Sequence, residues 1–396
     1  MRCLFIAITP IKKVKMDMRH SQITTNRNLD TRAPREILSN FSNHSLTGAA
    51  VAVINDGKLI YSGAAGVLDA DSRRLVKADS IFQVASVSKV VNALGILILV
   101  QEGDIKLADD VRDYLGSMRV PKYSTQNSKP SIRRILRHHG GVSQNGFSGY
   151  HQGINPLPTL DEIISGTGPA NHPAIIFSNV PGSVYDYSGG GTTLLQKTIE
   201  VVTGESYQCW MKQEVLAPLG MIRSTFDIGP PYSLANESEI ASGHDDIGEV
   251  WPGKRHNYPE SAAAGLYSTA IDLSQVIKVI NSGGEIDGVS FLRPDLIDKM
   301  LDSGQTGNVG LGCFLSQNGA WYHGGSNKGF LCRIAGRPNR NSGLVLLTNT
   351  DDPNGRDDIN PMLDYFKELK DIYDLCLLYT SPSPRDATLS RMPSSA

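Results

Sequence analysis

The sequence lacks the usual signatures of a metal centre or a disulfide framework. Its 396 residues include only five cysteines. These cysteines are scattered, and none forms a C-x-x-C pair. An odd and sparse set of this kind predicts neither a disulfide scaffold nor a zinc or redox site, so we expect no metal and no cofactor.

Strong charge and long apolar runs are also absent. The formal net charge is −2, which offers no basic field to nucleic acid. No run approaches the roughly 20 apolar residues that a membrane-spanning helix needs. We therefore expect no nucleic-acid partner and no membrane span. With 40% hydrophobic and 20% charged residues, the composition is that of a globular protein with one large domain or two intimate ones.

The first 30 residues show no clear period, and we expect 1–30 to be disordered or to precede the true start, at Met16 or Met18. The opening MRCLFIAITP has the short apolar segment of a secretory signal. Lysines follow it, however, in place of a small-residue cleavage site. The compartment stays open, with the cytoplasm slightly favoured over the periplasm or secretion.

The last 21 residues, 376–396, read CLLYTSPSPRDATLSRMPSSA and carry no apolar period. The first six of these residues, when back-translated into codons, give a transposase-adapter sequence, so we expect a non-native tail. The alternative is a disordered Pro/Ser tail. The domain is then expected over 31–375.

Strand patterns lie at both ends of this domain and helical patterns in the middle. Asp56-Gly57 between two apolar runs predicts a hairpin with a type I′ turn. Helices are expected over 32–43, 86–102, 193–203, 207–215, 272–281 and 360–374, and strands over 49–55, 59–66, 309–315, 320–323, 330–336 and 343–349. This order predicts an α+β fold, in which an antiparallel sheet from N- and C-terminal segments is flanked by helices and carries a mostly helical insertion at about 105–275.

The first chemical motif is Ser86-Val87-Ser88-Lys89, at the start of a predicted buried helix. Residues i and i+3 share a helix face, so the lysine lies beside the serine. A serine hydroxyl needs an adjacent base to act as a nucleophile. Burial lowers the pKa of a lysine and so makes it such a base. The alternative is that Ser86 only caps the helix and Lys89 is solvated.

Two further motifs follow. Tyr187 lies at a loop–helix junction before a glycine run that starts at Gly189, where a tyrosine can transfer a proton; a packed core tyrosine at a tight turn is the alternative. His323-Gly324-Gly325-Ser326-Asn327 lies at a strand edge, where a backbone N–H can contribute to an oxyanion hole. A glycine-rich turn with a surface histidine is the alternative there.

Together and in this order, the three motifs resemble those of the serine β-lactamase and penicillin-recognising superfamily, and most closely its class-C-like branch, which includes esterases and D-aminopeptidases. The resemblance runs from about residue 48 to 374. It includes non-catalytic stretches such as 131–141, SIRRILRHHGG, and 262–273, AAAGLYSTAIDL.

The resemblance implies a serine hydrolase that works through an acyl-enzyme. Ser86 would be the nucleophile, Lys89 its base and Tyr187 the proton shuttle. His323, Gly325 and Gly189 would line the substrate site, and the N–H groups of Ser86 and Ser326 would form the oxyanion hole. A further residue, His138, matches a histidine that recurs in the family and is interpreted as structural.

Two departures bear on the substrate. The third position of the family's Y-x-N is Gly189, and the first position of its K-T-G is His323. Because both lost side chains contact β-lactams in the family, we expect an esterase or amidase/peptidase that acts on a small ester, amide or peptide. An arginine on the following strand, Arg333 or Arg337, could replace the missing cation. A class C-like β-lactamase or D,D-carboxypeptidase and a catalytically silent binding module remain the alternatives. The oligomeric state is open.

Overall fold

The structure is a computed structural model, described here for residues 46–117, 128–228, 237–304 and 307–351. Its first element is a hairpin of β1 (Gly48–Asn55) and β2 (Lys58–Asp69). The turn residues Asp56 and Gly57 both have positive φ, at 47° and 72°. A type I′ turn requires this conformation, so the predicted hairpin is confirmed.

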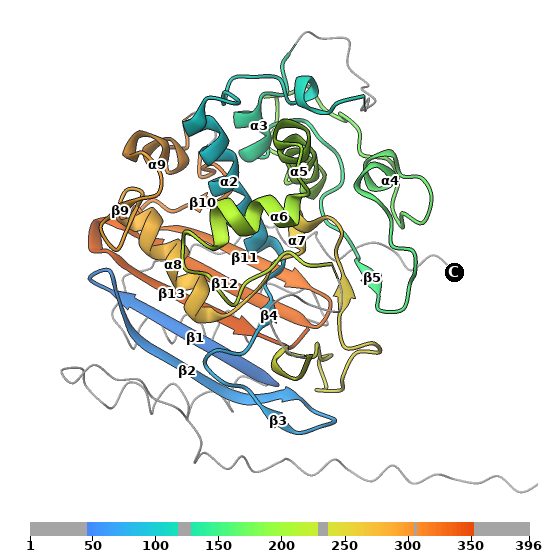
Figure 1. The fold of residues 1–396 in the computed structure, drawn as a ribbon, viewed down its shortest axis with the longest axis vertical. Coiled ribbons are helices and arrows are strands. Elements are labelled where there is room, and N and C mark those ends of the chain that lie inside the picture. Colours follow the sequence, from blue (N-terminus) through green and yellow to red (C-terminus); the bar gives the residue numbers. More distant parts are fainter. Residues whose placement is uncertain (1–45, 118–127, 229–236, 305–306, 352–396) are drawn as a thin grey trace, which may run out of the picture.

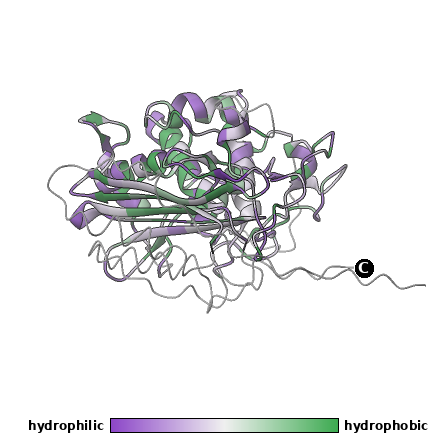
Figure 2. Ribbon diagram, turned by 90° about the horizontal axis from the view of Figure 1, so that it is seen from below, coloured by the Kyte–Doolittle hydropathy of each residue, from purple (hydrophilic) through white to green (hydrophobic). Residues whose placement is uncertain are grey.

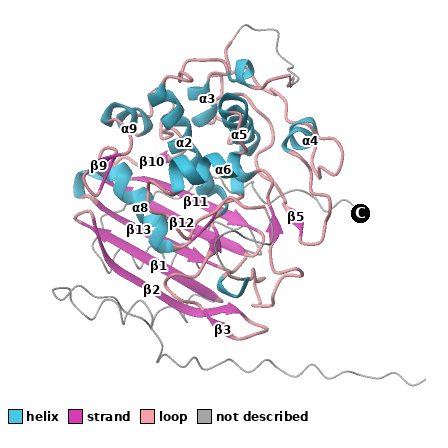
Figure 3. Ribbon diagram, viewed as in Figure 1, coloured by secondary structure: helices cyan, strands magenta, loops and turns pink. Residues whose placement is uncertain are grey.

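The main sheet joins the two ends of the domain. Its strands follow the order β10-β11-β12-β13-β1-β2-β3. The N-terminal β1 pairs antiparallel with the C-terminal β13, with Ala49 opposite Thr348 (Figures 1 and 3). This confirms the predicted α+β fold. The other strands are β3 (Arg74–Leu75), β10 (Phe314–Leu315), β11 (Trp321–Asn327), β12 (Phe330–Arg337) and β13 (Ser342–Thr348).

Helices cover one face of this sheet. α2 (Ser88–Glu102) and α8 (Ala270–Asn281) lie over it (Figure 1), and Figure 2 shows the sheet edge-on with helices on one side. Every residue of α2 from Ser88 to Leu99 is buried. The segment Ala85–Glu102 is long and apolar enough to cross a membrane, but 78% of it is buried inside the protein, which makes it a core helix of this fold.

Between β3 and β10 the described residues form mainly short helices separated by irregular segments (Figure 3). These are α3 (Ile132–Leu136), α4 (Leu160–Ser165), α5 (Gly189–Thr203), α6 (Tyr207–Met211), α7 (Ser261–Ala264) and α9 (Pro294–Met300). Two-residue strands pair between them: β4 (Phe82–Gln83) with β7 (Tyr267–Ser268), β5 (Tyr150–His151) with β6 (His256–Asn257), and β8 (Glu285–Ile286) with β9 (Val289–Ser290). The division into a sheet part and an insertion stays a prediction.

Several predicted boundaries differ from the structure. The glycine run is helical, since α5 begins at Gly189 with Ser188 as its N-cap and not at residue 193. The strand expected over 309–315 is reduced to β10, while β11 continues through Asn327 because its glycines remain paired with β12. The helices expected over 32–43 and 360–374, like 1–30 and 376–396, lie outside the described residues.

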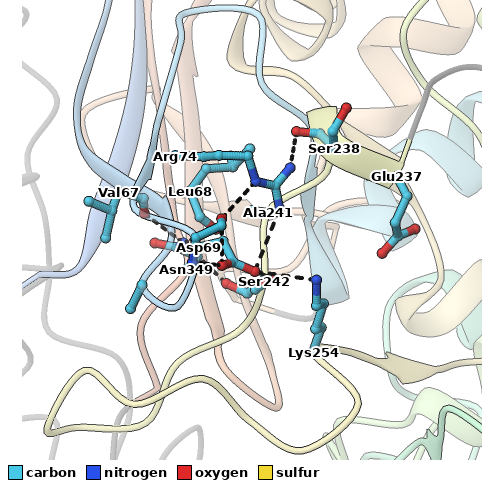
Figure 4. A network of polar contacts seen from close by, with 12 residues as sticks. Val67, Leu68, Asp69, Arg74, Glu237, Ser238, Ala241, Ser242, Lys254 and Asn349 are labelled. Carbon is cyan, nitrogen blue, oxygen red and sulfur yellow. Dashed lines mark hydrogen bonds and ion pairs between the residues drawn. The ribbon is translucent and has the colours of Figure 1, made fainter.

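A buried carboxylate at the end of β2 connects three distant segments (Figure 4). Asp69 is 1% exposed and accepts hydrogen bonds from Ser72 and, at 2.6 Å, from Ser242. Arg74 and Lys254 each approach the carboxylate to 3.5 Å. Burial alone would raise the pKa of Asp69, but the hydrogen bonds from Ser242 and Ser72 outweigh it and lower that pKa.

Candidate active site

Ser86 lies in a tight turn ahead of the core helix. The turn, η2 (Ala85–Val87), is a 3-10 helix, and α2 begins only at Ser88. Ala85 has a φ of 47°, a left-handed conformation that is rare for a residue with a side chain. The apolar pattern had predicted that Ser86 begins a regular α-helix. It lies instead on a strained turn that leaves the residue partly exposed.

Lys89 contacts the serine directly. Its Nζ lies 3.0 Å from Ser86 Oγ and 2.8 Å from the carbonyl oxygen of Ala263. The side chain is almost fully buried, and this burial lowers the pKa of Lys89 to about 7. At neutral pH a large fraction of Lys89 is then uncharged and can accept a proton.

Tyr187 faces the lysine from the other side of the site. It directly precedes Ser188, the N-cap of α5. The Lys89 Nζ lies 5.0 Å from the centroid of the Tyr187 ring. The ring is 7% exposed and is flanked by His138 and Phe314. The sequence pattern had separated Tyr187 from Ser86 by about a hundred residues, and the fold brings them together.

The His-Gly-Gly-Ser motif lies inside β11 and packs against η2. A Cβ on Gly325 would lie 2.5 Å from the carbonyl oxygen of Val84 and 3.0 Å from Ala85 Cβ. Only glycine therefore lets β11 approach the turn that carries Ser86 so closely. Ser326, the next residue, is exposed.

His323 lies on the same strand, with its ring centroid 6.2 Å from that of Tyr187. It is 2% exposed, and its Nε2 has no hydrogen-bond partner among the described residues. Burial, with a smaller contribution from the positive charge of Lys89, lowers the pKa of His323 to about 3. The imidazole is therefore uncharged at neutral pH.

Sequence reasoning missed the backbone segment that holds these parts together. The carbonyl oxygen of Ala263 accepts from Lys89, and that of Ala264 accepts from the buried amide of Asn327 at the end of β11. Leu266 accepts a hydrogen bond from Val84 and donates one to Ser88. The only signal in the sequence was the small-residue tract that ends at Gly265, which resembled the family but carried no functional side chain.

The position of Gly189 is closely packed by neighbouring residues. The residue is buried, and a Cβ there would lie 2.9 Å from the carbonyl oxygen of Asn145 and 3.0 Å from the ring of Phe147. Protein atoms already occupy the space in which the family's asparagine side chain would begin.

Arg333 lies on the opposite face of the sheet from His323. It pairs with Gly324, and its neighbours Leu331 and Ala335 belong to the cluster on the face turned away from α2. Its guanidinium stacks on Tyr322, 5.1 Å from the ring centroid. The strand position had suggested Arg333 as a replacement cation for the missing lysine, but its side chain is directed away from the site.

These residues form one constellation of a serine hydroxyl, a buried amine, a phenol and a neutral imidazole. Such a group can transfer an acyl group between oxygen and nitrogen nucleophiles. Within the described ranges, no group of three or more His, Cys, Asp or Glu residues could hold a metal ion. The roles of the individual residues remain predictions.

The sequence and fold define this protein as a member of a known class of serine hydrolases. The family model described as Beta-lactamase matches residues 31–366, and the chain belongs to this family, whose members act on esters and amides. Among curated proteins, Protein flp of Staphylococcus aureus is 23% identical over 321 residues, which cover 77% of this chain and 60% of that protein. The chain thus spans less than two thirds of the length of this relative.

Solved structures agree with the fold. The octameric penicillin-binding protein homologue from Pyrococcus abyssi aligns with a TM-score of 0.67 and 25% identity, over 86% of this chain and 79% of that one. EstCE1, a hydrolase with promiscuous acyltransferase activity, aligns with a TM-score of 0.69 and 19% identity, over 86% of this chain and 97% of that one. The D-amino acid amidase from Ochrobactrum anthropi aligns with a TM-score of 0.69 and 20% identity, over 87% of this chain and 98% of that one. The last two similarities support the fold alone.

Proposed function

We propose that this protein hydrolyses small esters or amides through an acyl-enzyme on Ser86. The observation that carries the proposal is the 3.0 Å contact between Ser86 Oγ and the buried Nζ of Lys89. A neutral amine at this distance is within reach of the serine proton. Lys89 acts as the base, and Tyr187 shuttles the proton.

The reaction would run in two halves. Lys89 Nζ takes the proton of Ser86 Oγ as this oxygen forms a bond to the substrate carbonyl carbon. The carbonyl oxygen becomes an oxyanion, held by the N–H groups of Ser86 and Ser326. Its collapse breaks the ester or amide bond, and the proton passes by way of Tyr187 to the departing oxygen or nitrogen. Water then cleaves the acyl-enzyme in the same manner and restores Ser86.

The substrate is proposed to be an uncharged ester in preference to a β-lactam. Neutral His323 offers no fixed positive charge to a carboxylate, and Arg333 lies on the other face of the sheet. Gly189 supplies no side-chain amide. Each missing hydrogen bond of this kind is worth about 1.5–3 kcal/mol, so two losses amount to roughly two to four decades in rate.

The test combines labelling with a substrate comparison. Intact mass after reaction with a fluorophosphonate should show one adduct, located on Ser86 by peptide mapping. The kcat/KM for p-nitrophenyl butyrate should exceed that for nitrocefin at the same pH. Failure of Ser86 to label would overturn the acyl-enzyme, and a higher kcat/KM for nitrocefin would replace the esterase with a β-lactamase.

A further inference from the structure

One residue, His138, holds the chain on both sides of Tyr187. Its carbonyl oxygen accepts the N–H of Asp186 at 2.8 Å. Its ring Nδ1 accepts the N–H of Ser188 at 3.1 Å. Asp186 and Ser188 are the two neighbours of Tyr187 in the sequence, so His138 holds the peptide group between Tyr185 and Asp186 and the one between Tyr187 and Ser188.

The backbone of His138 makes this double contact possible. The residue follows the short helix α3 and has a φ of 56°, in the left-handed region. This conformation is unfavourable for most residues with a side chain. Here it directs the carbonyl and the imidazole of the same residue toward one loop. The same conformation also closes the C-terminus of α3, since the N–H of His138 donates to the carbonyl oxygen of Ile135 and the N–H of His139 to that of Arg134.

The ring of His138 also packs on the tyrosine itself. The two ring centroids are 4.3 Å apart, with an angle of 40° between the planes. His138 is 4% exposed. Backbone and ring of Tyr187 are therefore both held by this residue, which leaves the phenol little freedom to turn away from Lys89.

The hydrogen bond from Ser188 also determines the form of the imidazole. Because the N–H of Ser188 donates to Nδ1, that nitrogen carries a lone pair, and the proton of neutral His138 sits on Nε2. Burial, reinforced by the nearby charge of Lys89, holds the pKa of His138 well below its ordinary value. The imidazole of His138 is thus in its neutral form, which can accept the hydrogen bond from the N–H of Ser188.

The adjacent histidine provides a natural contrast. His139 accepts the N–H of Gly182 through its carbonyl oxygen at 2.7 Å, and its ring packs on Tyr185 at 5.7 Å between centroids. It contacts the same loop at Gly182 and Tyr185, before Tyr187, and neither of these contacts involves Tyr187 or its two sequence neighbours. Both histidines therefore anchor this loop, but among these contacts only those of His138 involve Tyr187 and its two sequence neighbours.

We propose that His138 is a positioning residue for the proton-transfer tyrosine, acting through its Nδ1 acceptor and its left-handed backbone. The proposal rests on the function proposed above, because it assumes that the placement of Tyr187 limits the rate. His138 itself touches no reacting atom. Its effect should therefore fall on kcat, with substrate binding largely preserved.

The experiment compares two substitutions that both tolerate the left-handed backbone. His138→Asn keeps an acceptor, since its Oδ1 takes roughly the place of Nδ1, while His138→Gly removes it. We expect the glycine variant to lose on the order of 10²-fold in kcat, the size typical of a misplaced catalytic group, with KM within about threefold of wild type. The asparagine variant should stay within about fivefold of wild type in kcat.

Two controls accompany the pair. His139→Ala should keep kcat within about threefold, because its contacts lie away from Tyr187. In a Tyr187→Phe background, His138→Gly should cost less than about threefold, since its effect acts through the tyrosine hydroxyl. If circular dichroism shows the glycine variant to be unfolded, His138→Gln replaces it, because its longer side chain cannot present an acceptor at the Nδ1 position.

The outcomes separate the two proposals. The role of His138 would be overturned, while the proposed function stands, if His138→Asn and His138→Gly lost equal amounts of kcat. It would also be overturned if the kcat losses of His138→Gly and Tyr187→Phe multiplied in the double variant. A Tyr187→Phe variant within tenfold of wild type in kcat would overturn the proton shuttle itself. Near-normal kcat in His138→Asn, together with non-additive losses in the His138→Gly/Tyr187→Phe cycle, would support both the role of His138 and the proton shuttle.

Discussion

Lys89 lies in α2 and Tyr187 lies just before α5, far apart in the sequence, yet the lysine Nζ is 5.0 Å from the centroid of the tyrosine ring. The same Nζ donates a hydrogen bond to Ser86 Oγ at 3.0 Å. An amine, a phenol and a hydroxyl therefore share one site, and a change in one alters the environment of the others.

Ser86→Ala is expected to abolish ester hydrolysis and leave the fold intact. Only the hydroxyl is removed, and it makes no hydrogen bond on which the main core depends, so Tm should stay within about 3 °C of wild type. Hydrolysis of p-nitrophenyl butyrate and thermal unfolding measure the two effects. Residual activity within tenfold of wild type would show that another residue is the nucleophile.

Lys89→Ala and Tyr187→Phe should each cost on the order of 10²-fold or more in kcat/KM, as is usual for groups that transfer protons. Because both act on one proton, the double variant should be little worse than the poorer single one. A double-mutant cycle on the ester substrate measures this. Losses that simply multiply would argue for two independent roles.

The pH dependence of kcat/KM should report the lysine. A base must be deprotonated to act, and burial lowers the pKa of Lys89 to about 7. Activity should then rise as the pH increases through about 7 and level off above it. His323, with a pKa of about 3, would leave no inflection there. Lys89→Arg should be inactive across the range, because arginine keeps its proton. A flat profile from pH 5 to 9 would contradict this assignment.

Gly189→Asn should not create a β-lactamase, although it restores the family's residue type. The new Cβ would meet the Asn145 carbonyl oxygen and the Phe147 ring at 2.9 and 3.0 Å, and overpacking of this kind typically costs about 1–3 kcal/mol. We expect a lower Tm and no gain in nitrocefin hydrolysis. Gly189→Ala serves as the matched control for the steric effect alone. A tenfold gain in nitrocefin turnover by the asparagine variant would show that the loop can move aside.

Asp69→Asn should destabilise the protein at neutral pH by about 1–3 kcal/mol, the range for losing charge-assisted hydrogen bonds to a buried carboxylate. The pKa of Asp69 is lowered in the folded state. Its contribution to stability is therefore full above the ordinary carboxyl pKa and is lost progressively as the pH falls from there toward the lowered pKa of the folded state. Denaturant unfolding at pH 7 and pH 3 tests this.

The control for Asp69 is Asp295→Asn, an exposed carboxylate paired with Arg293 and Lys299. This variant should unfold within error of wild type, since exposed ion pairs contribute little to stability. If both variants lose the same stability, the network around Asp69 has no special role.

Much of the constellation could be predicted because its signals are local. Ser86 and Lys89 are three residues apart, and in a helix this spacing favours the contact that the structure shows. The hairpin at Asp56-Gly57 followed from turn chemistry in the same way. Resemblance to the family then related Tyr187 and His323 to this pair, although no periodicity joined them.

The tertiary structure alone decided the features that depend on neighbours distant in the sequence. Burial of Lys89 against Ala263, and with it the lowered pKa, arises from packing between α2 and α7. The direction of Arg333 depends on which face of β12 meets the helices. A motif specifies residue types along a chain, but desolvation, tautomer and side-chain direction depend on the atoms that the folded chain brings near, and these come from segments that no local pattern connects.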